Sequence, residues 1–242
     1  GSMISKKYDL DYFLITKNAA HKHSSGNILI SKLFSNEVHS LNEFWSSNID
    51  DYTKRVESDL KKNNFNPILI HKNEEIIFLK SLAYINVGIE LKAQFEEKKI
   101  KNPYIICTLN ESLLGLLLAS KLFNYDWKFI GIQIESNINI EKMMKIIETK
   151  SKELFNIDII FSDKDFEEKC DVSIDYGVLS EKNKQAILLA SEKENILLNP
   201  LNDCKTLTYV IENAKKLSDK NLIIINTGTN VSIYNYLQNL NL

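Results

Sequence analysis

The chain has few cysteines, no excess of charge of either sign and no long apolar run. Its three cysteines, Cys107, Cys170 and Cys204, lie far apart without CxxC spacing, which argues against a disulfide framework and fits a reducing compartment. A formal net charge of -2 gives no overall field that would attract nucleic acid or an anionic membrane. The longest apolar run, residues 113–119, is too short to span a bilayer. We expect a cytoplasmic protein without a nucleic-acid or membrane partner.

Several motifs that carry chemistry are also missing. The sequence has no G-x-S-x-G, P-loop, dinucleotide-binding or H-E-x-x-H motif. His21 and His23 alternate and could share a strand face with His39, but no Cys, Asp or Glu completes a metal shell at matching spacing. We therefore expect solvated loop histidines and no metal site. Cys107 lies in an apolar run and is expected to be a buried small hydrophobic residue.

The beginning of the chain gives no sign of a leader. Gly1 and Ser2 before Met3 are typical of the scar left by tag cleavage, so we expect the natural chain to start at Met3. Charged side chains such as Lys6 and Asp9 interrupt any apolar segment that could act as a signal peptide.

What the sequence does contain is an alternation of short β-rich runs and longer segments of helical period. This pattern is typical of an α/β fold with parallel sheets. We expect two α/β lobes, a smaller one over residues 3–100 and a larger one over 101–242. The predicted strands cover residues 12–16, 37–40, 67–71, 104–108, 129–135, 158–161, 172–175 and 222–227. The predicted helices cover residues 26–34, 49–62, 74–98, 112–123, 140–155, 181–194, 206–217 and 231–240.

Three blocks in the last third carry a family resemblance. They read DYGVLS at residues 175–180, ILLNP at 196–200 and IIINTGT at 223–229. In order and spacing they resemble the C-terminal part of the D-cysteine desulfhydrase and 1-aminocyclopropane-1-carboxylate (ACC) deaminase family. The resemblance continues upstream in SGNILISKLF at 25–34, PILI at 67–70, IICT at 105–108 and KFIGI at 128–132. It implies the tryptophan-synthase-β-like fold and an enzyme that uses pyridoxal phosphate (PLP).

The family's phosphate-binding turn looks degenerate here. In the family a glycine-rich turn, TGSGGTxAG, wraps the PLP phosphate with backbone N–H groups at a helix N-terminus. The corresponding residues are Thr108, Leu109, Asn110, Glu111 and Ser112, without a glycine. The Glu111 carboxylate would lie close to a phosphate, at a cost of roughly 4 kcal/mol for two like charges about 4 Å apart. We therefore expect no bound cofactor. PLP would be bound only if the chain were part of a PLP-dependent lyase or deaminase.

The lysine that the resemblance implies also lacks a counterpart. In the family the GNKxRKLE segment supplies the Schiff-base lysine and precedes the block that corresponds to residues 12–16. Only nine residues, 3–11, precede that block once the tag scar is left out, so we expect the segment to be missing. Another lysine would need the same placement against the cofactor aldehyde, and Lys22 has the most suggestive setting.

Some cleft residues of the family have partial matches. Asp175 and Tyr176 stand where the family has an acidic or small residue and a tyrosine before glycine, and Asn226 and Thr227 stand at its HTGG motif. These four are candidate cleft residues. Lys205 matches the lysine of the family's DPVYTGK motif. The competing interpretations are a strand-ending turn for Asp175 and Tyr176, and a surface position for Lys205.

The sequence thus predicts a non-catalytic homologue, a pseudoenzyme that binds a small molecule in a residual cleft or acts as an interaction subunit. A homo-oligomer or a partner protein is expected, because losing the leading segment would expose apolar surface. The alternative is a PLP-dependent lyase or deaminase that acts on a small amino acid, with its lysine segment supplied by another chain or missing from the given sequence. A third possibility is a new activity with Asp175, Tyr176, Glu111 or His71 as acid–base groups.

Overall fold

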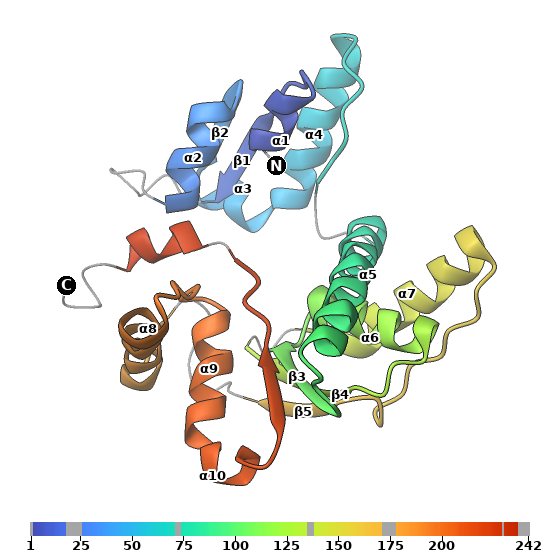
Figure 1. Ribbon diagram of the computed structural model, residues 1–242. Coiled ribbons are helices and arrows are strands. Elements are labelled where there is room, and N and C mark those ends of the chain that lie inside the picture. Colours follow the sequence, from blue (N-terminus) through green and yellow to red (C-terminus); the bar gives the residue numbers. More distant parts are fainter. Residues whose placement is uncertain are drawn as a thin grey trace. The chain divides into compact units, whose positions relative to one another are not determined.

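The computed structural model describes residues 2–17, 26–70, 74–134, 138–170, 178–228 and 230–236. Contacts between Cα atoms divide the chain into two units (Figure 1). Unit 1 comprises residues 1–70, 231–238 and 242, and unit 2 comprises residues 71–230 and 239–241. Each described helix is too short or too polar to cross a bilayer.

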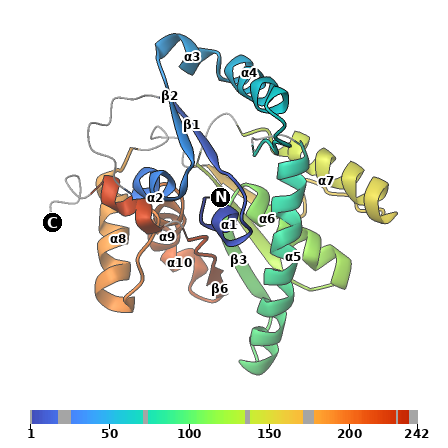
Figure 2. The same ribbon diagram turned by 90° about the horizontal axis from the view of Figure 1, so that it is seen from above.

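Unit 1 is built on two parallel strands, β1 (Phe13–Lys17) and β2 (Glu37–Leu41), which lie side by side in Figures 1 and 2. Phe13 pairs with Glu37, and the register continues to the pair of Lys17 and Leu41. The crossover between the strands contains α2 (Gly26–Phe34), as parallel pairing requires. The remaining helical segments are α1 (Ser2–Lys7), α3 (Glu43–Ser47), α4 (Ile49–Lys62) and the 3-10 helix η1 (Asn230–Asn235).

Unit 2 is built on a four-stranded parallel sheet in the order β5-β4-β3-β6. The two central strands are apolar and almost fully buried, as expected for strands covered on both faces. The four strands are β3 (Pro103–Thr108), β4 (Lys128–Gln133), β5 (Glu167–Cys170) and β6 (Asn221–Ile224).

Helices cover both faces of this sheet (Figure 1). Ile105 and Phe129 pack into a core with one set of helices, whereas Ile106 and Ile130, one residue further along each strand, pack against the other set. The first set is α5 (Glu74–Glu97), α6 (Glu111–Phe123) and α7 (Ile140–Phe155). The second side carries α9 (Asp203–Glu212) and α10 (Ala214–Leu217), with α8 (Glu181–Glu194) packed on α9. The predicted α/β class with parallel sheets is confirmed.

Helices α5 and α6 approach each other closely at Gly115. A Cβ atom on this residue would lie 2.3 Å from the carbonyl oxygen of Ser81 and 2.6 Å from the Cβ atom of Tyr84. The lack of a side chain at Gly115 therefore sets the position of α5, and of Tyr84, over the start of α6.

Two predicted strands are wrong. Residues 67–70 form no strand, and Ile68 and Ile70 are exposed rather than buried. Residues 158–161 are also outside any strand, because the N–H of Phe161 donates to the Glu148 carboxylate at 2.8 Å instead of to a neighbouring strand. The strand that pairs with β4 comes later, as β5.

The last predicted helices also differ from the structure. The helix expected at 206–217 starts earlier, at Asp203, and is divided into α9 and α10 at Asn213. The segment expected as a helix at 231–240 contains the short η1. The predicted strand at 172–175 lies outside the described residues.

Candidate functional site

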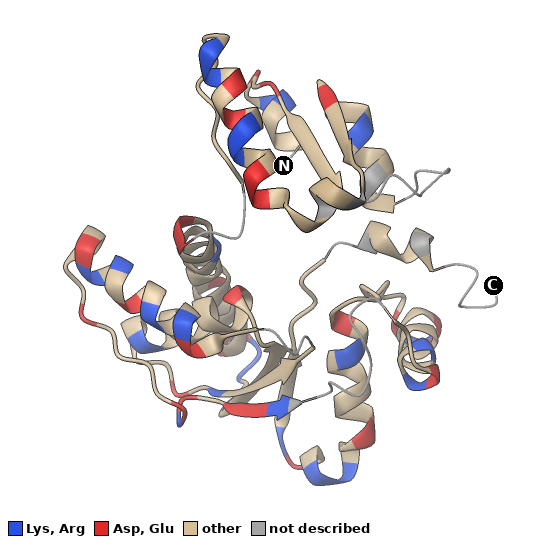
Figure 3. Ribbon diagram, turned by 180° about the vertical axis from the view of Figure 1, so that it is seen from behind, with Lys and Arg blue, Asp and Glu red and all other residues tan. Residues whose placement is uncertain are grey.

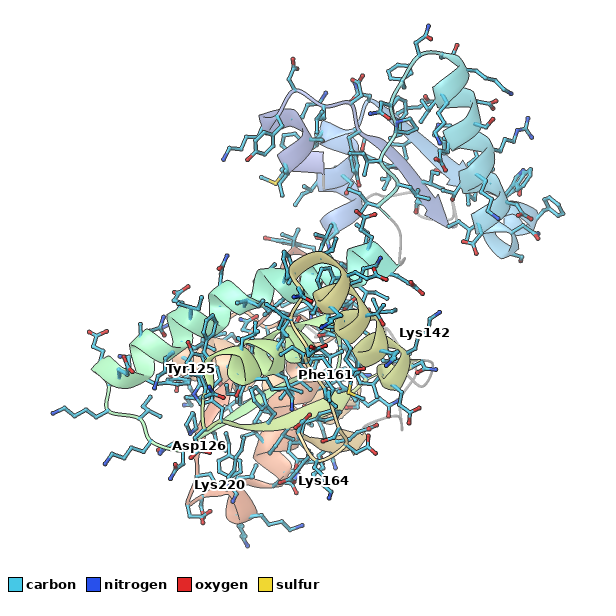
Figure 4. The ribbon with its side chains drawn as sticks, turned by 90° about the vertical axis from the view of Figure 1, so that its right-hand side faces the viewer. Tyr125, Asp126, Lys142, Phe161, Lys164 and Lys220 are labelled. Atoms are coloured by element: carbon cyan, nitrogen blue, oxygen red, sulfur yellow. The ribbon has the colours of Figure 1, made fainter. Side chains whose placement is uncertain are left out.

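The carboxyl-terminal ends of β3 and β6 bring two polar segments of unit 2 together. In a parallel sheet the carboxyl-terminal ends of all strands lie on the same side, where the following loops and helix N-termini meet. Beyond β3 lie Thr108 and the first turn of α6, and beyond β6 the chain reaches Thr227, which is hydrogen-bonded to Asp203 in the first turn of α9. In Figure 4, Tyr125, Asp126 and Lys220 lie at the opposite edge, in the turns before β4 and β6.

The turn between β3 and α6 is capped by the side chain of one of its own residues, Asn110. Asn110 has an extended backbone, with φ of -159° and ψ of -162°, and its Oδ1 accepts a hydrogen bond of 2.8 Å from the N–H of Ser112. The N–H of Leu109 donates to the Ile132 carbonyl at 2.9 Å. Asn110 is thus an ordinary N-cap that satisfies a helix N–H group from within the chain.

These contacts decide whether a phosphate fits. The N–H groups of Leu109 and Ser112 already have acceptors, so a phosphate would have to displace the Asn110 side chain. Glu111, the first residue of α6, holds a partly buried carboxylate 3.6 Å from the Lys80 ammonium. The residues at this helix N-terminus therefore do not fit the phosphate group of PLP.

Tyr84, from α5, lies over this turn. Burial raises the pKa of the Tyr84 hydroxyl, a hydrogen bond with Ser112 lowers it, and the charges of Cys107, Asp203 and Glu111 each raise it. Burial, followed by the charge of Asp203, raises the pKa of Cys107 to about 12. The thiol is therefore protonated at neutral pH. The burial predicted for Cys107 from the sequence is confirmed.

Asp203 is the most deeply buried carboxyl of the site, with no exposed surface. Its Oδ1 accepts hydrogen bonds from the N–H of Thr227 at 3.3 Å and from the Thr227 hydroxyl at 3.0 Å. Burial raises the pKa of Asp203, and the bonds from Thr227 and from the Asn199 backbone oppose this rise. Both bonds from Thr227 end on Oδ1.

Four buried side-chain atoms have no hydrogen-bond partner within the described part of the chain. They are Thr108 Oγ1, Asp203 Oδ2, Lys205 Nζ and Thr206 Oγ1, all at the end of β3 or in the first turn of α9. Asp203 and Thr206 are three residues apart and share a helix face, whereas Lys205 lies on another face. An unpaired buried polar group costs about 1–3 kcal/mol, and a charged group costs more. This concentration marks a place where a ligand could supply the missing partners.

The structure places the predicted cleft residues in different surroundings. Thr227 lies in the site through its contacts with Asp203, whereas Asn226 is exposed and its Oδ1 accepts a hydrogen bond from the N–H of Gly228. Asp175 and Tyr176 lie outside the described residues, as do the candidates His71 and Lys22. The surface interpretation of Lys205 is wrong, because only 1% of this residue is exposed.

Tyr84 and Asp203 were not found from the sequence. Asp203 had a local signal, since it follows the ILLNP block and precedes the matched Lys205 by two residues. Tyr84 had none, because only the packing of α5 on α6 brings it to the site. Among the described residues, no three His, Cys, Asp or Glu side chains are grouped so as to hold a metal ion.

Comparisons with known proteins agree with the fold. No family model matches the chain. The 1-aminocyclopropane-1-carboxylate deaminase of Rhizobium rhizogenes is 25% identical over 195 residues, which is 79% of this chain and 58% of the relative. The enzyme of the same name from Bradyrhizobium diazoefficiens is 23% identical over 202 residues, again 79% of this chain and 58% of the relative. The chain thus spans 58% of the length of these two curated relatives.

Solved structures show the same architecture. The crystal structure of an ACC deaminase homologue matches with a TM-score of 0.82 and 21% identity, covering 99% of this chain and 72% of that one. The structure of O-ureido-L-serine synthase matches with a TM-score of 0.60 and 8% identity, covering 92% and 66%. The fold implied by the sequence motifs is therefore confirmed.

Proposed function

We propose, for a chain that is related in sequence and fold to the ACC deaminase and D-cysteine desulfhydrase family, a role without the PLP chemistry of that family. In this proposal the chain is a pseudoenzyme. Its site at the ends of β3 and β6 binds a small molecule that carries no phosphate.

One observation carries the proposal. The Asn110 side chain accepts a hydrogen bond from the Ser112 N–H, so one N–H group of the helix N-terminus that holds a phosphate in the family already has a partner within the chain. Glu111 adds a negative charge at the same helix end. Binding an anion here would break the hydrogen bond that Asn110 now makes within the turn. The Glu111 carboxylate would also repel the anion.

The remaining groups indicate what the site could bind. Asp203 Oδ2, Thr108 Oγ1 and Thr206 Oγ1 are buried and lack partners, and each can accept a hydrogen bond. Carboxyl groups at Asp203 and Glu111 favour a neutral or cationic ligand over an anionic one. A small molecule with an amine or amide donor fits these groups. ACC, the compound in the relatives' names, is the first candidate to test.

The test starts with PLP. The full chain is titrated with PLP while visible absorbance is recorded, then reduced with borohydride and mapped by peptide mass spectrometry. We expect no reducible adduct at one defined lysine. An adduct at a single site would overturn the proposal and favour a PLP-dependent lyase or deaminase, with the buried Lys205 the first residue to inspect.

Ligand binding is tested separately. ACC is added to the wild-type chain and to D203N, and the thermal unfolding midpoint is measured. We expect ACC to raise the midpoint of the wild type, and to raise that of D203N less, because the variant lacks a carboxylate to pair with the amine. An equal rise in both proteins would place ACC elsewhere, and no rise would exclude ACC as the ligand.

We also propose that the chain self-associates through the apolar segment 67–70 of unit 1. The exposed fractions of Ile68 and Ile70 are 81% and 66%, and the backbone there pairs with no described strand. Exposed apolar backbone of this kind can add to a strand edge of another copy. Light scattering after size-exclusion chromatography should give a dimer for the wild type and a monomer for I68K/I70K. A monomeric wild type would contradict this proposal.

A further inference from the structure

A polar groove lies within unit 1. It has a volume of about 420 Å³ and lies between the two strands and α4. Phe13, Val56 and Leu60 give it apolar walls, and Glu37, His39, Tyr52, Arg55, Asp59 and Asn63 give it polar ones. All of these residues come from positions 13–63, so the groove is complete within one unit.

Three of the polar residues form a hydrogen-bonded chain. His39 Nδ1 lies 2.7 Å from the Tyr52 hydroxyl, and His39 Nε2 lies 3.1 Å from a carboxylate oxygen of Glu37. With Glu37 ionised, Nε2–H donates to the carboxylate, and in the neutral ring Nδ1 accepts from the tyrosine. These two hydrogen bonds of His39 fix the Tyr52 ring and give the Glu37 carboxylate a partner.

The second carboxylate of the groove also has a partner. Asp59 Oδ1 lies 3.3 Å from the Lys62 ammonium, one turn along α4. Both acidic groups of the groove are therefore engaged by other side chains of the same unit.

Arg55 is the exception. It lines the groove, it is exposed, and its guanidinium makes no hydrogen bond or ion pair within the described part of the chain. It is also the only arginine of the sequence, the other 29 of the 30 Lys and Arg residues being lysine. A guanidinium offers paired N–H donors that match a carboxylate, which a lysine ammonium cannot do.

We propose that this groove binds a small carboxylate with an apolar or aromatic body. The carboxylate would bind to Arg55, and the body would pack on Phe13, Val56 and Leu60. A monoanion is favoured over a phosphate dianion, because Glu37 and Asp59 also line the groove and repel a second negative charge more strongly. The proposal does not depend on the function proposed for unit 2.

Phenylacetate is a suitable probe, and Trp45 provides the signal. The Trp45 ring lies 5.2 Å from the Tyr52 ring, whereas the other tryptophan, Trp127, packs against Phe95 in unit 2. Phenylacetate is titrated into the full chain carrying W127F, and Trp45 fluorescence is followed. The variants are R55Q, R55K and the control K54Q, which removes a neighbouring exposed charge on α4 that does not line this groove.

We expect saturable binding that K54Q leaves within twofold and R55Q weakens by roughly tenfold or more, with R55K in between. R55K keeps the charge and, with unchanged circular dichroism, shows that weaker binding is not unfolding. Equal losses in K54Q and R55Q would reduce the effect to general charge and overturn the proposal. Three other outcomes would also overturn the proposal. They are competition by inorganic phosphate as strong as that by phenylacetate, equal binding of phenethylamine, and the lack of saturable phenylacetate binding.

Discussion

The carboxyl group of Asp203 accepts two hydrogen bonds from Thr227, one of 3.3 Å from the Thr227 N–H and one of 3.0 Å from the Thr227 hydroxyl. The two bonds connect the first turn of α9 to the segment that follows β6. They use only Oδ1, so Oδ2 stays buried without a partner in the described part of the molecule. The contact therefore holds α9 against the segment that follows β6 through one oxygen of the carboxyl group.

D203N should change how stability depends on pH. Because burial raises the pKa of Asp203, its stabilising contribution is complete below the pKa in the unfolded chain and is lost as pH rises through the higher folded pKa. The free energy of unfolding of the wild type should therefore fall relative to that of D203N as pH rises from 4 to 8. Urea unfolding at several pH values measures this difference. The exposed Asp163 supplies the control D163N, which should follow the wild type, and a constant difference for D203N would contradict the expectation.

N110A should remove a helix cap and lower the free energy of unfolding by about 1 kcal/mol. Asn139, which caps α7 by accepting from the N–H of Lys142 at 2.8 Å, gives the matched variant N139A with a similar loss. Denaturant unfolding compares the two. The proposals for the site add a second expectation, that N110A alone frees the Ser112 N–H for an anion. Inorganic phosphate should then stabilise N110A more than N139A, and equal stabilisation would count against a closed phosphate turn.

K205M should raise the free energy of unfolding of the ligand-free chain by about 1–3 kcal/mol. The Lys205 ammonium is buried without a hydrogen-bond partner among the described residues, and methionine has similar length without the charge. K145M is the control, because the Lys145 side chain is 77% exposed and should contribute little. If K205M instead destabilises the chain, the ammonium has a partner that compensates for its burial.

G115A should destabilise the chain by about 1–3 kcal/mol, because α5 and α6 must move apart to accept a methyl group. G228A is a useful comparison. A Cβ atom there would have nothing within 4 Å, but φ is +85°, so any loss comes from backbone conformation alone. The shift should also reach Tyr84, whose fluorescence or NMR signals should change in G115A and stay constant in G228A. Unchanged stability of G115A would contradict the close packing of the two helices.

The central strands and the turn after them could be predicted from the sequence because their signals are local. The strand β3 is a continuous apolar run, and the lack of glycine before Gly115 already indicated that the phosphate turn was altered. In contrast, β5 contains three charged residues in four positions and gives no apolar signal. Residues 158–161 resemble a strand in composition, but the carboxylate of Glu148 takes the N–H of Phe161.

The site was predicted less completely, because much of it is assembled by contacts between distant segments. Thr108 and Thr227 were named from motif matches. Tyr84 comes from a helix that carries no matched motif, and its position depends on how α5 packs on α6. The unpaired state of Lys205 and Asp203 likewise depends on tertiary burial, which one sequence does not reveal.

The strand order of unit 2 also bears on synthesis at the ribosome. Pro103 of β3 pairs with Asn221 of β6, 118 positions later in the chain. During translation, β3 and β4 can pair early, but one edge of β3 stays open until β6 has emerged. A nascent chain that pauses between them presents an apolar strand edge, so folding of this unit should depend on chaperones that shield such edges.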